Sequence, residues 1–158
     1  MIDKKKILEV IIADYKDKLE RYKRSMEEAQ QEANYHKGAM ESRYDTFKEE
    51  AQMLKEGFAK QFNETNEVLK ILQSYKMNII DKKFNKALPG AIVKCIVNDK
   101  DERNFFIIKR VHFNEYNIND ICITTLNSDA PLAKKLLNLE EGDEIEFNND
   151  LLEIEEII

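Results

Sequence analysis

The chain has 158 residues, of which 35% are charged, and it contains only four Gly and two Pro, a composition more typical of an elongated helical protein than of one compact globule. Residues 1–88 hold 18 Lys and Arg against 16 Asp and Glu, a net charge of +2, whereas residues 89–158 hold 7 against 15, a net charge of −8. Phosphate would repel the acidic second part, which argues against sequence-specific or nonspecific DNA binding there and favours a basic protein surface as partner.

The cysteines and the hydropathy pattern indicate the compartment. Cys95 and Cys122 lie in apolar, strand-like runs without the spacing of a zinc site, so we expect two buried and reduced thiols. The sequence contains no run of 18 apolar residues, and its first residues lack the apolar core of a signal peptide. We therefore expect a cytoplasmic protein with no membrane-spanning helix.

Two heptad-like series dominate the first half of the chain, with apolar or small residues at alternating spacings of four and three. The first series is Leu8, Ile12, Tyr15, Leu19, Tyr22, Met26, Ala29 and Ala33, and the second is Tyr44, Phe47, Ala51, Leu54, Phe58, Gln61, Thr65, Val68, Leu72 and Tyr75. Between them Gly38 can adopt the left-handed conformation that ends a helix, and Ser42 with Asp45 fits the capping box that begins another. The sequence thus predicts an antiparallel coiled-coil hairpin over residues 1–80, with its tip near 36–45.

The register of this hairpin can be predicted from side-chain size. If the turn is centred on Gly38, residues whose numbers total 76 or 77 lie opposite each other. Ala29 then faces Phe47 and Ala33 faces Tyr44, so that small and bulky side chains share the available space. The alternative is one continuous helix that pairs with a second copy of the chain. The interruption at Gly38 and the matched sizes favour the hairpin, and with it a monomer.

A second domain is predicted over residues 91–158, after a linker over 81–90 that contains Pro89 and Gly90. Strand-like runs cover residues 91–98, 104–113, 120–126, 144–147 and 151–157, and Pro131 opens a short helix over 131–137. The run Asn148-Asn149-Asp150 supplies a hairpin turn between the last two strands. The predicted fold class is α+β, with a helical hairpin followed by a small sheet domain.

Candidate functional residues gather at the predicted tip. Because the sequence contains no phosphate-binding loop, nucleophile elbow or metal-ligand cluster, we do not expect the chain to be an enzyme. The tip combines Glu32, Glu41 and Asp45 with the basic residues His36 and Arg43. Carboxylates on a projecting hairpin could complete the ligand shell of a Mg²⁺ ion held mainly by another protein. Asp45 can be explained by its role in a capping box, and Glu32 by its place on a solvated helix face. Glu41 is therefore the acidic residue for which a structural role is least evident.

The segment from Leu126 to Ile145 resembles the C-terminal signature of the Gre family of bacterial transcript-cleavage factors. The residues that carry this resemblance include Ser128, Pro131, Leu132, Gly142 and Asp143. The preceding run Pro89-Gly90-Ala91-Ile92-Val93 is similar to the first strand of the same family domain. The resemblance therefore spans most of residues 89–158.

This resemblance implies a C-terminal domain like the FK506-binding proteins (FKBP-like), which docks on RNA polymerase, and a coiled coil that enters the secondary channel of the polymerase. In cleavage-competent members of the family, acidic tip residues help to hold the second Mg²⁺ with which the polymerase hydrolyses backtracked RNA. Glu41 and Asp45 are the candidate ligands here, and only in complex with the polymerase. The two positions that carry the acid pair in the family correspond to Glu28 and Gln31 in this sequence. Because Gln31 is not acidic, the pair is not preserved.

Two functions follow from the resemblance. Either the tip acids assist cleavage of backtracked RNA, or the hairpin occupies the channel and modulates initiation, elongation or pausing without cleavage. The missing acid pair favours the second function. The alternative from another class is a non-transcriptional, coiled-coil interaction protein or chaperone-like protein with a catalytically inactive FKBP-like domain.

Overall fold

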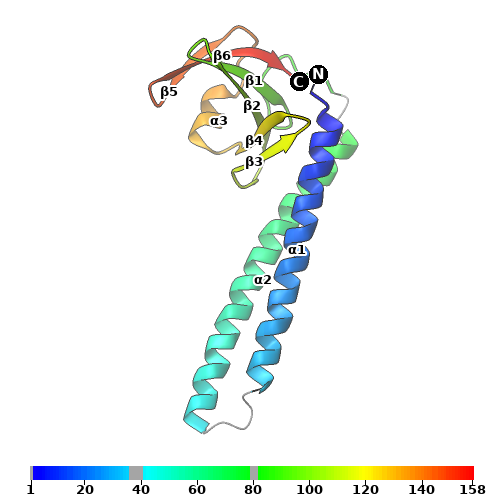
Figure 1. Ribbon diagram of the computed structural model, residues 1–158, viewed down its shortest axis with the longest axis vertical. Helices are drawn as coiled ribbons and strands as arrows, with labels where there is room; N and C mark the ends of the chain where they lie inside the picture. Colours follow the sequence, from blue (N-terminus) through cyan, green and yellow to red (C-terminus); the bar gives the residue numbers. More distant parts are fainter. Residues whose placement is uncertain (1, 36–40, 79–81) are drawn as a thin grey trace. The chain divides into compact units, whose positions relative to one another are not determined.

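The computed structural model describes residues 2–35, 41–78 and 82–158, with side chains for all of these except 41–44. Its elements are α1 (Lys4–Tyr35), α2 (Glu41–Asn78), β1 (Ile92–Val97), β2 (Asp101–Ile108), β3 (Asn114–Ile118), β4 (Ile121–Asn127), α3 (Pro131–Leu136), β5 (Glu144–Phe147) and β6 (Asp150–Ile157) (Figure 1). The chain divides into two compact units, one of residues 12–70 and one of residues 1–11 with 71–158. Two long helices and a sheet domain confirm the predicted α+β class.

Residues 12–70 contain the greater part of both long helices, which lie side by side (Figure 1). A contact between them joins Lys55 Nζ to Gln30 Oε1 at 2.9 Å. The series of spacings four and three therefore corresponds to a helical pair, as predicted. Gly38, the predicted turn residue, lies outside the described residues, and α2 begins at Glu41, one residue before Ser42, the predicted N-cap.

The contacts between the two helices differ from those of the predicted register, in which residues whose numbers total 76 or 77 lie opposite each other. Gln30 pairs with Lys55, and Glu9 pairs with Lys76 at 2.9 Å. In each pair the two residue numbers total 85, and each pair lies within one of the two units.

Burial within residues 12–70 supports the shifted register. Ala29 and Ala51 are both buried, whereas Phe47, the predicted neighbour of Ala29, is 39% exposed. Leu54, a residue of the predicted seam, is 52% exposed. Matched side-chain sizes at one end of the hairpin did not determine the register. Several registers can bury apolar series of similar composition, and the packing of the paired helices selects among them.

The sheet has the strand order β3-β4-β2-β1-β6-β5. All neighbouring strands are antiparallel except β2 and β4, which are parallel. One face of the sheet packs with α3 in a buried core that includes Val93, Cys95, Phe105, Ile107, Leu126, Ala133, Leu136 and Ile154. Since side chains alternate along a strand, the neighbouring residues Ile92, Phe106 and Ile108, which are also fully buried, belong to the opposite face.

The predicted elements of this domain need two corrections. β3 was not predicted, because its sequence Asn-Glu-Tyr-Asn-Ile contains residues that are depleted in strands. The predicted strand 104–113 is also displaced, since β2 covers Asp101–Ile108. The turn at Asn148 and Asn149 is confirmed: both have positive φ, at 53° and 68°, and Phe147 pairs with Asp150 across it.

Part of the segment predicted as a linker belongs to the core of the sheet domain. Phe84 and Ala87 are buried and pack in the same cluster as the residues around α3. Ala87 N donates to Leu139 O at 2.8 Å, and Asn138 N donates to Ala87 O at 2.8 Å. These main-chain hydrogen bonds attach the segment to the chain that follows α3.

Candidate functional site

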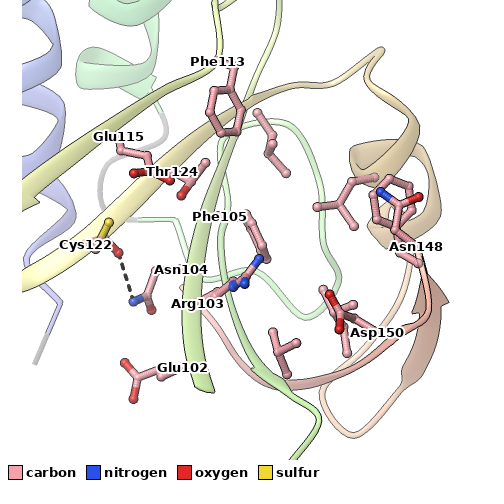
Figure 2. Close-up of a pocket in the computed structure, with 15 residues that line it drawn as sticks. Glu102, Arg103, Asn104, Phe105, Phe113, Glu115, Cys122, Thr124, Asn148 and Asp150 are labelled. Carbon is pink, nitrogen blue, oxygen red and sulfur yellow. Dashed lines mark hydrogen bonds between the residues drawn. The ribbon is translucent and has the colours of Figure 1, made fainter. Parts of the chain in front are cut away.

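A cavity of about 420 Å³ opens on the face of the sheet that carries α3 (Figure 2). Its apolar lining includes Phe105 from β2, Leu126 from β4, Leu132 from α3, Phe147 from β5 and Leu152 from β6. Because the first, second and last of these also belong to the hydrophobic core, the cavity is an open extension of that core. Cavities of this size are in the range that binds small molecules or side chains of a partner.

The border of the cavity carries aromatic and charged residues. Phe113, which precedes β3, is 69% exposed, and Figure 2 places it on another side of the cavity from Asn148 and Asp150. Glu115 and Arg103 also line the cavity, and among the described residues neither side chain makes an ion pair. Asp150 Oδ1 accepts a hydrogen bond from Asn98 Nδ2 at 2.7 Å.

Glu102, another acid of the lining, is engaged elsewhere. Lys94 Nζ lies 2.7 Å from a carboxylate oxygen of Glu155 and 3.0 Å from one of Glu102. The hydrogen bonds to Glu155 and Glu102 raise the pKa of Lys94 to about 12. With Glu102 paired in this way, Glu115 and Asp150 are the acids of the cavity that remain for a partner.

The two cysteines differ in exposure. Cys95 is buried, as predicted, and burial raises the pKa of its thiol to about 12. Cys122 is exposed and lines the cavity, so the prediction of a second buried thiol was wrong. The apolar run around Cys122 indicated a strand correctly, but this position of β4 faces the open cavity and not the closed part of the core.

Asn104 is a buried polar residue beside the cavity. It is 4% exposed, and its Nδ2 donates to Cys122 O at 3.2 Å, while its Oδ1 has no hydrogen-bond partner among the described residues. Along β2 it alternates with Arg103 and Phe105, so its side chain points to the opposite side of the strand (Figure 2). Asn104 therefore does not offer its oxygen to the cavity.

The first part of the Gre-like segment builds the wall formed by α3. Ser128 N donates to Ile108 O at 3.1 Å, which ties the end of β4 to β2. Pro131 occupies the first turn of α3, where its missing N–H costs no hydrogen bond. Leu132, the next residue, lines the cavity. Three signature residues thus position the helix that borders the cavity.

The second part of the segment forms the turn before β5. Gly142 has a φ of +88°, a conformation that side-chain-bearing residues rarely adopt, and its N donates to Ile154 O at 2.8 Å. Asp143 Oδ2 accepts a hydrogen bond from Glu140 N at 2.7 Å. The signature residues therefore have structural roles: some of them position α3, and the others form the turn before β5.

The residues predicted for the tip are described only in part. Glu32 near the end of α1 and Asp45 near the start of α2 are both exposed. Glu41 and Arg43 belong to α2, but their side chains are not described, and His36 lies outside the described residues. The grouping of these five residues at one site stays a prediction.

Among the described side chains, which exclude those of residues 41–44, no three His, Cys, Asp or Glu groups lie together so that they could hold a metal ion. None of the helices in the described part of the chain is sufficiently long and apolar to cross a membrane.

Comparisons with known proteins give limited similarity. No protein-family model and no curated protein matches the chain. It is similar to a solved structure described as GreA factor homolog 1 (Gfh1) of Thermus thermophilus, with 12% identity, 93% of this chain and 94% of that chain covered, and a TM-score of 0.39. A second structure, described as the transcription factor Gfh1, gives 12% identity, 92% coverage of each chain and a TM-score of 0.37. Similarities at this level carry no argument about function.

Proposed function

We propose that this chain is a Gre-like regulator of bacterial RNA polymerase, which binds the enzyme through residues 89–158 and inserts the tip of its helical hairpin into the secondary channel. The observation that carries the proposal is the Gre-like segment from Leu126 to Ile145 in a chain that also has two long paired helices. The signature residues of that segment position α3 beside the cavity, so the resemblance extends to the part of the domain best suited to contact a partner.

Charge supports docking through the sheet domain. Residues 89–158 carry a net charge of −8, and Glu115 and Asp150 lie at the cavity. A basic surface on the polymerase would complement this charge and accelerate association. Direct binding of the domain to nucleic acid would be unfavourable for the same reason.

In this proposal the polymerase retains all of the chemistry, and the chain is not itself an enzyme. A Mg²⁺ ion shared with the polymerase active site would supply activation of water for the hydrolysis of backtracked RNA. Glu41 and Asp45 are the residues we propose as carboxylate ligands, with Glu32, His36 and Arg43 contacting the channel wall. Because Glu28 and Gln31 do not reproduce the acid pair of the family, we favour modulation of elongation or pausing over stimulated cleavage.

The first test is binding. The full-length chain is mixed with core RNA polymerase at moderate salt and separated by gel filtration. Co-elution is expected, and a chain that elutes alone overturns the proposal and leaves the non-transcriptional or chaperone-like alternative. The polymerase alone and the chain alone serve as elution standards.

The second test separates the two outcomes at the tip. A backtracked elongation complex is incubated with Mg²⁺ and the chain, and shortening of the RNA is measured. We expect altered pausing with little shortening; strong shortening that the double variant Glu41→Ala and Asp45→Ala abolishes would establish cleavage stimulation instead. Glu49→Ala with Glu56→Ala, two exposed acids of the same helix, is the matched control. Helicity is compared by circular dichroism, because Asp45→Ala could also remove a cap worth about 1 kcal/mol.

A further inference from the structure

A second cavity lies within the unit of residues 1–11 and 71–158, where the start of α1 meets the end of β6 (Figure 1). Its volume is about 710 Å³, in the range of pockets that bind small molecules. We call it the basic cavity, because its lining includes four lysines, Lys4, Lys5, Lys82 and Lys83.

The four lysines of the basic cavity have no acidic partner in the described part of the chain. None of them forms an ion pair with an Asp or Glu there. Other lysines of the same unit are paired: Lys76 with Glu9 and Lys86 with Glu140, both at 2.9 Å. The charges around the basic cavity are therefore available to a ligand.

The acids of the lining are fewer, and two of them are engaged by the main chain. Four lysines stand against Asp3, Glu141 and Glu156, a formal net charge of +1 in a domain whose net charge is −8. Asp3 Oδ1 accepts from Lys6 N at 3.1 Å, and Glu141 Oε1 accepts from Ile157 N at 2.9 Å. The side chains that can turn toward a ligand are therefore mainly cationic.

Two of the ammonium groups lie beside one aromatic ring. Lys4 Nζ is 4.3 Å and Lys82 Nζ 5.4 Å from the centroid of Phe84. Lys4 is only 8% exposed, and its Nζ donates to Ile158 O at 3.2 Å, which fixes its position and uses one of its three N–H donors. Two positive charges near one ring repel each other, and an anion with several charges that binds both removes this repulsion.

The start of α1 adds main-chain donors to the same cavity. Asp3 satisfies the N–H groups of Lys6 and Ile7, at 3.1 and 3.0 Å. The N–H groups of Lys4 and Lys5, in the first turn, have no acceptor among the described residues. The positive end of the helix dipole thus faces the same region as the lysines and favours an anion there.

We propose that the basic cavity binds a linear phosphate chain, either inorganic or the triphosphate of a nucleotide, through the ammonium groups of its four lysines and the first N–H groups of α1. Several cations around one cavity favour an anion with several charges over a single phosphate or sulfate. Phe84, the aromatic residue of the lining, is 7% exposed and offers little surface to a base. This inference is independent of the proposed function, since it involves neither the polymerase nor the hairpin tip.

The test titrates the full-length chain with sodium tripolyphosphate in a calorimeter, at pH 7 and low salt and without divalent cations. Tripolyphosphate should bind roughly tenfold more tightly than inorganic phosphate or sulfate, and its affinity should fall as NaCl is added, because salt screens the charges. Absence of tripolyphosphate binding, or equal affinity for sulfate, overturns the proposal.

A parallel titration with ATP distinguishes the two sources of the phosphate chain. Similar affinities would show that the phosphates are recognised whatever carries them. Tighter binding of ATP would assign the site to a nucleotide, and weaker binding would assign it to an inorganic chain. Binding of ATP without any binding of tripolyphosphate would overturn the proposal, because the base and sugar would then be what the chain recognises.

Variants locate the site. Lys82→Gln with Lys83→Gln, both at exposed positions, should weaken tripolyphosphate binding roughly tenfold. Lys100→Gln with Lys109→Gln removes the same charge from exposed positions of the sheet domain outside the lining and should leave the affinity nearly unchanged. Glu156→Gln should strengthen binding, because it removes a negative charge from the lining. If the Lys82 and Lys83 variant binds like the wild type, or if Glu156→Gln weakens binding, the anion lies elsewhere and the proposal is overturned.

Discussion

The ammonium group of Lys4 lies 4.3 Å from the centroid of the Phe84 ring, and only 8% of Lys4 is exposed. Lys4 Nζ also donates to the main-chain oxygen of Ile158 at 3.2 Å. The aromatic ring favours the charged amine, while burial disfavours it. Burial dominates and lowers the pKa of Lys4 to about 8.

The lowered pKa of Lys4 should make stability depend on pH. An unfolded lysine titrates near its ordinary value of 10.5, so between about pH 8 and pH 10.5 the unfolded chain binds more protons at this site than the folded chain. The free energy of unfolding of the wild type, relative to Lys4→Met, should therefore rise by about 1–3 kcal/mol across this interval. Urea denaturation at a series of pH values measures it. The exposed neighbour variant Lys5→Met should parallel the wild type, and parallel curves for Lys4→Met would contradict the assignment.

The two thiols should react at very different rates. Cys122 is exposed, whereas Cys95 is buried and its pKa is raised to about 12, so it is almost entirely protonated near neutral pH. In the native chain an aromatic disulfide reagent should modify only Cys122, and in denaturant it should modify both. The Cys122→Ser variant should be unreactive until it is denatured. Rapid modification of that variant in native buffer would refute the placement of Cys95.

Two leucines of α2 test the register of the helical pair. Leu69 is 7% exposed although it lies outside the predicted series, whereas Leu54 belongs to that series and is 52% exposed. Leu69→Ala should therefore lower the free energy of unfolding by about 2–4 kcal/mol, and Leu54→Ala by less than about 1 kcal/mol. Urea denaturation followed by helical circular dichroism measures both. The reverse order would favour the register predicted from side-chain size.

Two glycines should respond to alanine with opposite signs. Gly57 lies in α2 with no atom within 4 Å of an added Cβ, so Gly57→Ala should stabilise the chain by about 0.5–1 kcal/mol. Gly142 has equal space, but its φ is +88°, so Gly142→Ala should destabilise it by about 1 kcal/mol or more. Thermal denaturation distinguishes the signs. A stabilising Gly142→Ala would mean that this turn changes conformation readily.

Much of the candidate site depends on contacts between distant segments of the chain, which no local sequence pattern contains. Pro131 predicted the start of α3, because the backbone requirement of that position appears directly in the residue type. The cavity was not predicted, since it combines residues from all six strands and α3. Thr125, which anchors the chain on both sides of Phe113, also gave no signal, because a Thr in a strand is ordinary.

The sequence by itself determined the elements whose causes are local. The spacing of apolar residues specifies two long helices, and Asn148 with Asn149 specifies a tight hairpin turn, since both effects act within a few residues. The tertiary structure decided the register of the helices, the pairing of β3, the exposure of Cys122 and the burial of Phe84. Each of these depends on which distant segment packs against the residue, and the chain sequence near that residue does not contain this information.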